Sequence, residues 1–123
     1  MNPILLIVDD DSAVREGLKL ALELKGYEVA LAADAESAID WLTTSTPALV
    51  ILDCQLPGMS GTDAAEHIRG KFGELPILGI SAHRDREAEM LQSGVTAFRP
   101  KPLDIRKFVS EIDALTGKSR SVD

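Results

Sequence analysis

Three aspartates, a serine and a lysine lie at matching places in the sequence, close to the ends of short apolar runs. Asp9 and Asp10 follow the first run, and Asp53 follows the third. Ser81 follows the fourth run, and Lys101 comes shortly after the fifth. Carboxylates that lie close together repel one another, which raises their pKa values or demands a cation. Oxygen ligands without histidine or cysteine favour a hard ion such as Mg²⁺.

These residue types together suit phosphoryl transfer. Magnesium in proteins usually takes one or two carboxylates plus phosphate oxygens, so the site looks incomplete without a phosphoryl group. Lys101 supplies a compact cation for phosphate oxygens, and Ser81 supplies a hydroxyl donor. Asp53 could then act as a nucleophile and form an aspartyl phosphate. The pattern therefore predicts a site that handles a phosphoryl group.

Five apolar runs predict the β-strands that place these side chains. The run that ends at Leu52 has no polar residue, as expected of a strand buried on both faces. Polar residues alternate in the second run, which is typical of an edge strand. The predicted strands are Ile4–Val8, Tyr27–Leu31, Ala48–Leu52, Pro76–Ile80 and Thr96–Phe98.

The segments between and after these strands predict five helices. Asp11 or Ser12, Asp34 and Asp104 are candidate N-caps, and glycines follow several of the helices. The third helix is expected over Gly61–Lys71 and the fourth over Asp85–Gln92. Apolar residues at a spacing of three and four define the inner faces. The expected inner residues are Val14, Leu18, Ala21, Leu22 and Leu24 in the first helix, Ala35, Ala38, Ile39 and Leu42 in the second, Ala64, Ala65 and Ile68 in the third, and Ile105, Phe108, Val109, Ile112 and Leu115 in the fifth.

Regular alternation of strands and helices predicts an α/β fold with a doubly wound parallel sheet. Five such units in a chain of this length favour the flavodoxin-like strand order 2-1-3-4-5. In that order the first and third strands are neighbours, so Asp9, Asp10 and Asp53 should lie together at one edge of the sheet. Ligands bind at this edge in open α/β sheets.

Length and composition exclude several classes of protein. The chain has 123 residues, 45% of them hydrophobic, which suits one domain with one core. We expect the domain over residues 1–117 and a polar tail or linker over 118–123. The net charge of −7 and a pI near 4.8 argue against direct binding of nucleic acid. No stretch is long and apolar enough for a membrane span or resembles a signal peptide. A single cysteine, Cys54, permits no internal disulfide, and the expected location is the cytoplasm.

At this point the sequence resembles a response regulator receiver domain of two-component signalling. The resemblance rests on Val8-Asp9-Asp10, Leu52-Asp53, the loop Leu56-Pro57-Gly58-Met59-Ser60-Gly61, Ile80-Ser81-Ala82 and Lys101-Pro102. It extends from Ile4 to about Leu115. Each motif alone is weak, whereas all of them in this order at matching strand ends are specific.

The resemblance implies a role for each acidic residue of the site. Asp53 would be the phosphoacceptor and would also contact the metal. Asp10 would bind Mg²⁺ directly, and Asp9 would bind it through water. The backbone carbonyl of Gln55 would be a further ligand, and His83 together with Gln55 would flank the phosphoryl group.

It also implies the parts of a switch. Ser81 would be the hydroxyl that turns toward the phosphoryl group, and Phe98 the aromatic side chain that moves between outward and inward rotamers. Lys101 would pair with Asp53 or its phosphate, and the Lys101-Pro102 bond would be cis.

A receiver domain accepts its phosphoryl group from a sensor histidine kinase or a histidine phosphotransfer protein. It then changes its surface around helix four, strand five and helix five to control an output partner or a fused output domain. We expect no substrate turnover beyond assisted phosphorylation and slow dephosphorylation. A monomer or a phosphorylation-dependent dimer fits the family. Ala97 stands where many DNA-binding members carry acidic dimer residues, and Pro100 before the lysine is a further departure.

Other interpretations remain open from the residues alone. An aspartate-nucleophile phosphohydrolase has a second aspartate two residues after the nucleophile, where this chain has Gln55. A flavin carrier of the same fold would need a phosphate loop rich in serine, threonine and glycine after the first strand, where Asp9-Asp10-Asp11 would instead repel a flavin phosphate. Phe98 could be a fixed core residue and His83 an exposed loop residue. Cys54 is interpreted as a small buried filler.

Overall fold

The structure, a computed structural model, describes residues 3–117 and contains one sheet of five parallel strands in this range. The order is β2-β1-β3-β4-β5, so the predicted 2-1-3-4-5 arrangement is confirmed. Val8 pairs with Leu52 in the central register, which brings the ends of β1 and β3 side by side. The strands are β1 (Ile4–Val8), β2 (Glu28–Ala32), β3 (Leu49–Asp53), β4 (Ile77–Ser81) and β5 (Ala97–Pro100).

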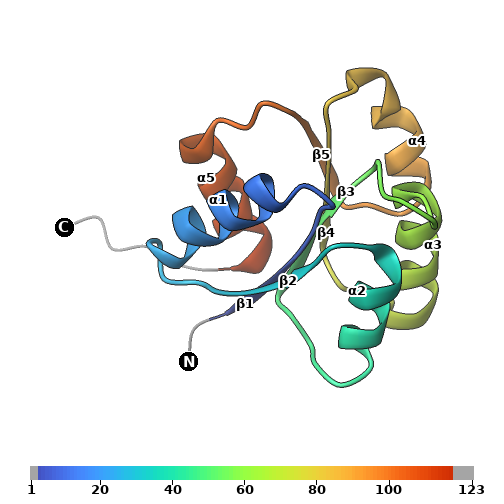
Figure 1. The fold of residues 1–123 in the computed structure, drawn as a ribbon, viewed down its shortest axis with the longest axis horizontal. Helices are drawn as coiled ribbons and strands as arrows, with labels where there is room; N and C mark the ends of the chain where they lie inside the picture. The colour runs from blue at the N-terminus through green and yellow to red at the C-terminus, as the bar shows by residue number, and fades with distance from the viewer. Residues whose placement is uncertain (1–2, 118–123) are drawn as a thin grey trace.

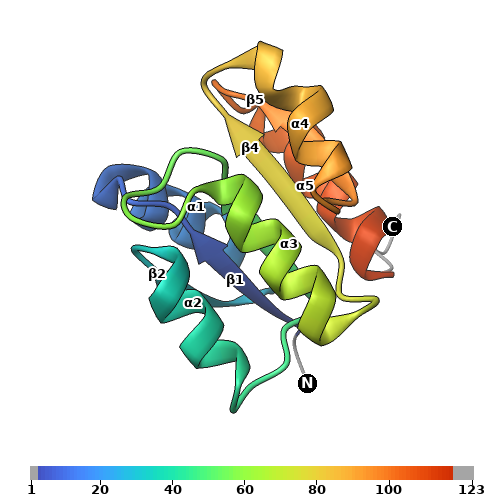
Figure 2. The same ribbon diagram turned by 90° about the vertical axis from the view of Figure 1, so that its right-hand side faces the viewer.

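Helices cover both faces of this sheet (Figure 1). Two helices, α1 and α5, pack on one face, and α2, α3 and α4 pack on the other, as the rotated view in Figure 2 also shows. The predicted caps Asp11, Asp34 and Asp104 accept backbone N–H bonds at three helix starts, and Ser60 caps α3. The helices are α1 (Ser12–Glu23), α2 (Ala35–Leu42), α3 (Gly61–Phe72), α4 (Glu87–Gln92) and α5 (Ile105–Thr116).

Several predicted boundaries move by one or two residues. Strand β2 starts one residue later than expected and ends at Ala32, and β5 continues to Pro100. The predicted fourth helix begins as a 3₁₀ turn over Arg84–Arg86, and only Glu87–Gln92 is α-helical. Propensity and pattern define where an element lies better than where it ends, because the terminal residues are decided by tertiary contacts.

Two residues expected on inner helix faces are exposed. Leu24 is 77% exposed, because it lies about 200° around the helix from the buried Leu22. Tyr27, only 3% exposed, packs into the core just after the helix instead. Ile105 is 38% exposed, because it starts α5 at the rim of an open groove rather than over the sheet.

The core consists of one apolar cluster on each face of the sheet. The close approach of α4 to β4 shows how tightly one of them is packed. A Cβ atom on Gly79 would lie 2.9 Å from Met90 Cε and 3.6 Å from Phe98 Cδ1, so a larger residue in β4 would displace Met90. Strand β4 therefore packs directly against Met90 of α4 and against the inward ring of Phe98.

No helix within residues 3–117 has the length and hydropathy needed to cross a bilayer.

Candidate functional site

The three predicted carboxylates meet at the carboxyl ends of β1 and β3. Oxygen atoms of Asp9, Asp10 and Asp53 all lie within 4.8 Å of one another. Asp9 is fully buried, Asp53 is 5% exposed, and Asp10 is exposed. The cluster therefore has a buried floor and one carboxylate open to solvent.

Lys101 reaches this cluster from the loop after β5. Its Nζ lies 2.9 Å from Asp9 Oδ2 and 3.3 Å from Asp53 Oδ2. Its backbone N–H donates to the carbonyl of Ser81 at 2.7 Å, and its peptide bond to Pro102 is cis, as predicted. Burial lowers the pKa of Lys101, but the bonds and charges of Asp9 and Asp53 outweigh it and hold that pKa above its ordinary value. The lysine is thus held as a cation between two carboxylates.

The position of Asp53 disfavours the ionised form of its carboxyl group. Burial raises its pKa above the ordinary value, and the charge of Asp9 adds to this effect. The Gln55 N–H, which donates to Asp53 Oδ1 at 3.0 Å, and the ammonium of Lys101 lower the pKa but compensate only in part. A further cation beside Asp53 would stabilise its ionised form, which is the form that can act as a nucleophile.

Asp9 is positioned by contacts that the sequence did not reveal. The Asp11 N–H donates to Asp9 Oδ1 at 2.9 Å. The Arg15 guanidinium donates to the Asp9 carbonyl at 2.7 Å from the first turns of α1. The only sequence signal for this contact is the spacing of the two residues, because Arg15 follows Asp9 by six positions, about one turn into the helix after the strand.

Ser81 lies in the same corner but points to other partners. Its fully buried Oγ accepts from the Cys54 thiol at 3.3 Å and from the His83 N–H at 3.0 Å. Among the described hydrogen bonds, none joins Ser81 to Asp53. The register of β3 and β4 places Ser81 beside Cys54, the residue after Asp53, and Ser81 Oγ is bonded to Cys54 and His83 rather than to the carboxylates.

The loop after Asp53 depends on glycine at one close approach. A Cβ on Gly61 would lie 2.3 Å from the backbone Cα of Cys54, and the Gly61 N–H donates to the Cys54 carbonyl at 3.0 Å. The start of α3 therefore packs on the backbone that follows Asp53. Gln55 projects from this loop as an exposed side chain, and His83 is exposed after β4.

Phe98 points inward from β5 and is only 2% exposed. It belongs to the cluster that also holds Met90 of α4. Next to it, Arg99 pairs with Glu111 of α5. The structure therefore shows the inward rotamer of the predicted switch residue, and Cys54 is buried as predicted.

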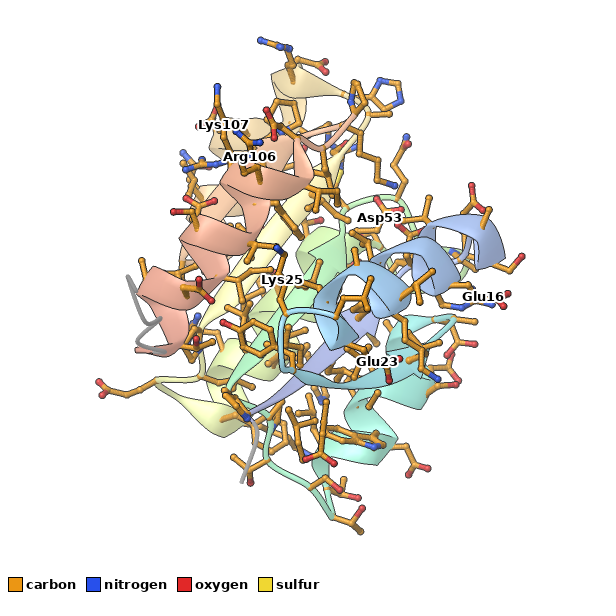
Figure 3. All side chains as sticks on the ribbon, turned by 90° about the vertical axis from the view of Figure 1, so that its left-hand side faces the viewer. Glu16, Glu23, Lys25, Asp53, Arg106 and Lys107 are labelled. Atoms are coloured by element: carbon orange, nitrogen blue, oxygen red, sulfur yellow. The ribbon has the colours of Figure 1, made fainter. Side chains whose placement is uncertain are left out.

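An apolar groove of about 610 Å³ adjoins the site and was not predicted from the sequence. It runs between α1 and the segment that leads into α5, on the face drawn in Figure 3. In that view Asp53 lies at the end of the sheet beyond α1, Glu16 and Glu23 lie on α1, and Arg106 and Lys107 lie on α5. The groove is lined by Ala13, Val14, Gly17, Leu18, Ala21, Ala82, Lys101, Pro102, Leu103 and Ile105.

The donor set of the carboxylate cluster fits Mg²⁺. All of its candidate ligand atoms are carboxylate oxygens, which are the ligands that a hard divalent ion prefers. The solvent-open position of Asp10 leaves room for the waters that Mg²⁺ usually keeps. Within residues 3–117, no histidine or cysteine belongs to this candidate metal site. The predicted carbonyl ligand of Gln55 stays a prediction.

Comparison with known proteins gives a consistent result. The model of the family "Response regulator receiver domain" matches residues 5–113. Response regulator MprA of Mycobacterium tuberculosis is 34% identical over 126 residues, which cover 100% of this chain and 54% of that protein. The chain thus spans about half the length of the curated relatives it matches.

Solved structures of response regulators have a closely similar fold. A putative response regulator from Chloroflexus aurantiacus has a TM-score of 0.90 at 30% identity, over 96% of this chain and 100% of that one. The response regulator TrrA from Thermotoga maritima, solved in complex with Mg²⁺ and BeF, has a TM-score of 0.87 at 29% identity, over 94% of this chain and 99% of that one.

The sheet order, the carboxylate cluster and these matches define a phosphoacceptor signalling domain with the flavodoxin-like fold. The chain belongs to the response regulator receiver domain family of two-component systems. Domains of this family are regulatory phosphoacceptors rather than enzymes that turn over a substrate.

Proposed function

We propose that Asp53 accepts a phosphoryl group from a phosphohistidine of a sensor histidine kinase or a histidine phosphotransfer protein. A carboxylate oxygen of Asp53 attacks phosphorus, the P–N bond breaks, and the released imidazole takes up a proton. The observation that carries this proposal is the contact of Lys101 with Asp53 inside a cluster of three carboxylates. The ammonium can stabilise the negative charge that is spread over the phosphoryl oxygens in the transition state.

The burial of each acid supports its proposed metal role. Asp10 is exposed and can bind Mg²⁺ directly. Asp9 is fully buried, which favours a role through water. Asp53 and the carbonyl of Gln55 complete the proposed set. Held by these residues, Mg²⁺ would supply positive charge that neutralises phosphoryl oxygens.

The apolar groove beside Lys101 gives the donor a place to dock. Its apolar lining and its position next to the carboxylate cluster suit an amphipathic helix that carries the donor histidine. Arg106 and Lys107 follow the groove residue Ile105 on α5 and are exposed, so they can pair with acidic groups on such a helix.

The output is proposed to travel through Ser81 and Phe98 to the face of α4, β5 and α5. A shift from 1:99 to 99:1 in a two-state equilibrium takes about 5.5 kcal/mol, and one charge-assisted hydrogen bond supplies roughly 1.5–3 kcal/mol. Ser81, Lys101 and the metal must therefore act together. The pair of exposed Arg99 and half-buried Glu111 lies on this face and can exchange partners in an output complex or dimer.

Three further features belong to the proposal. Residues 1–117 act as the receiver domain, and residues 118–123, which lie outside the described residues, act as a polar tail or as a linker to an output domain. Nucleic acid is not bound by this domain itself. Gln55 offers no acid group two residues after Asp53, which favours a slowly hydrolysed phosphoryl group in a cytoplasmic signalling pathway.

The proposal is tested with acetyl phosphate as a small phosphodonor in the presence of Mg²⁺. Wild-type protein should gain one phosphoryl group by intact mass, and Asp53→Ala should gain none. Undiminished labelling of Asp53→Ala would sink the assignment. Amide chemical shifts with beryllofluoride should then change on α4, β5 and α5; changes confined to the site itself would remove the proposed output face.

A further inference from the structure

We propose that Cys54 is a positioning residue that holds the Ser81 hydroxyl away from Asp53 in the unphosphorylated protein. The inference rests on the proposed function, in which Ser81 turns toward a phosphoryl group on Asp53. It adds a residue to the switch that neither the spacing of the sequence nor the family resemblance assigns a role.

The two side chains meet because their strands are neighbours. Strand β3 pairs with β4, and the Cys54 N–H donates to the Ile80 carbonyl at 2.9 Å. This register puts Cys54 beside Ser81, and the thiol donates to Ser81 Oγ at 3.3 Å. Cys54 is 1% exposed and Ser81 is fully buried, so water does not compete for the contact.

The bonds around Ser81 define one orientation of its hydroxyl. A serine hydroxyl has two acceptor positions and one donor. The Cys54 thiol and the His83 N–H occupy the two acceptor positions. When Ser81 turns to donate to a phosphoryl oxygen, the contact with Cys54 breaks and leaves the buried thiol without its acceptor. The thiol therefore favours the unphosphorylated arrangement.

The size of the effect follows from the chemistry of sulfur. A thiol is a weak hydrogen-bond donor, so its loss should shift the switch by a few-fold rather than by orders of magnitude. We expect a two- to fivefold gain in affinity for a phosphoryl mimic when the donor is removed. A residue that only fills space would alter the stability of the fold and leave this affinity unchanged.

Beryllofluoride with Mg²⁺ is the probe, and its dissociation constant is measured by calorimetry for folded protein. Cys54→Ala should bind two- to fivefold more tightly than wild type. Cys54→Ser keeps a donor at this position and should stay within about twofold of wild type. Cys54→Val, which also lacks a donor but fills more space, should behave like Cys54→Ala and replaces it if the alanine variant does not fold.

A double-mutant cycle separates positioning from packing. In a Ser81→Ala background, Cys54→Ala and Cys54→Val should change the affinity for beryllofluoride by less than the error of measurement. Equal affinities of wild type and Cys54→Val, or the same gain in the Ser81→Ala background, would overturn the inference. If wild-type protein does not bind beryllofluoride, both the proposed function and this inference are overturned. If wild type binds it and Cys54→Val has the same affinity as wild type, only the inference is overturned.

Discussion

The ammonium of Lys101 lies closer to Asp9 than to Asp53, at 2.9 Å from Asp9 Oδ2 and 3.3 Å from Asp53 Oδ2. The lysine thus joins the ends of two neighbouring strands through their carboxylates. It partly neutralises a cluster that would otherwise hold like charges in a buried corner. This arrangement makes Lys101 a structural residue as well as a candidate phosphate ligand.

Replacing Lys101 should therefore lower stability. Lys101→Met keeps the length of the side chain but leaves Asp9 and Asp53 without their cation. Removing one partner of a buried ion pair costs about 3–5 kcal/mol. Because the Lys101 side chain is 22% exposed, we expect a smaller loss, about 2 kcal/mol in urea unfolding. Lys107→Met, at an exposed position of α5, is the control and should change stability by less than about 0.5 kcal/mol. Equal effects of the two variants would remove the structural role of Lys101.

Asp53→Asn should stabilise the protein in the absence of divalent ions. The change removes one of three clustered carboxylates while Asp9 still pairs with Lys101. The midpoint of urea unfolding in EDTA should rise, because like-charge repulsion and the burial of one anion are both relieved. Asp63→Asn, an exposed aspartate of α3, serves as the control. A lower midpoint for Asp53→Asn would show that the cluster is not strained by charge.

Magnesium should stabilise wild type more than variants that lack one of the proposed metal ligands. Binding to the folded state alone stabilises by about 2.7 kcal/mol when the free ion is at one hundred times its dissociation constant. Wild type should approach this gain in a Mg²⁺ titration followed by urea unfolding. Asp53→Asn and Asp10→Asn should gain much less, because each lacks one proposed ligand. The same gain in all three proteins would place the ion elsewhere.

Two glycines test the docking groove. Gly17 lines the groove and Gly70 lies on the exposed part of α3, and a Cβ at either position would meet nothing within 4 Å. Glutamine at either position should raise helix stability by about 0.5–1 kcal/mol. Only Gly17→Gln fills the groove, so it should slow phosphotransfer from a histidine kinase that phosphorylates wild type, at least tenfold. Labelling by acetyl phosphate should remain unchanged in both. Equal phosphotransfer to both variants would show that the donor docks elsewhere.

The cap of α2 should make part of the stability depend on pH. The Ser37 N–H donates to Asp34 Oδ1 at 2.7 Å and lowers the pKa of Asp34, so the ionised form stabilises the folded state. This contribution is present above the pKa of the unfolded chain, near 4, and is lost as the pH falls through the lower folded value. Asp34→Ser keeps a capping oxygen that does not titrate. Wild type should lose stability relative to Asp34→Ser as the pH falls below about 4, and a constant difference would contradict the assignment.

The sequence predicts the sheet order and the positions of Asp9, Asp10, Asp53 and Lys101. The carboxyl ends of parallel strands lie at one edge of the sheet, so residues at those ends come together. Contacts that depend on how two elements pack, and so on where their side chains point, are harder to predict. The bond of Cys54 to Ser81 depends on the register of β3 and β4, and that of Arg15 to Asp9 on the angle of α1. Leu24 fails as a core residue because it lies on the other side of the helix from Leu22, and Ile105 fails because it begins α5 at the rim of the groove.

The groove beside Lys101 was also not predictable, for a related reason. Its lining combines residues of α1 with residues of the loop before α5, which are far apart in the chain and meet only in the folded protein. An apolar position such as Ile105 looks the same in the sequence whether it covers the sheet or borders open solvent.

The central claim is that Asp53, rather than Asp9 or Asp10, carries the phosphoryl group. The most direct measurement is peptide mapping of protein treated with acetyl phosphate and Mg²⁺, after the acyl phosphate has been reduced with borohydride to mark its position. The account predicts one reduced residue at Asp53 and none when Mg²⁺ is replaced by EDTA. A mark at Asp9 or Asp10, or a mark at Asp53 that does not depend on Mg²⁺, would contradict it.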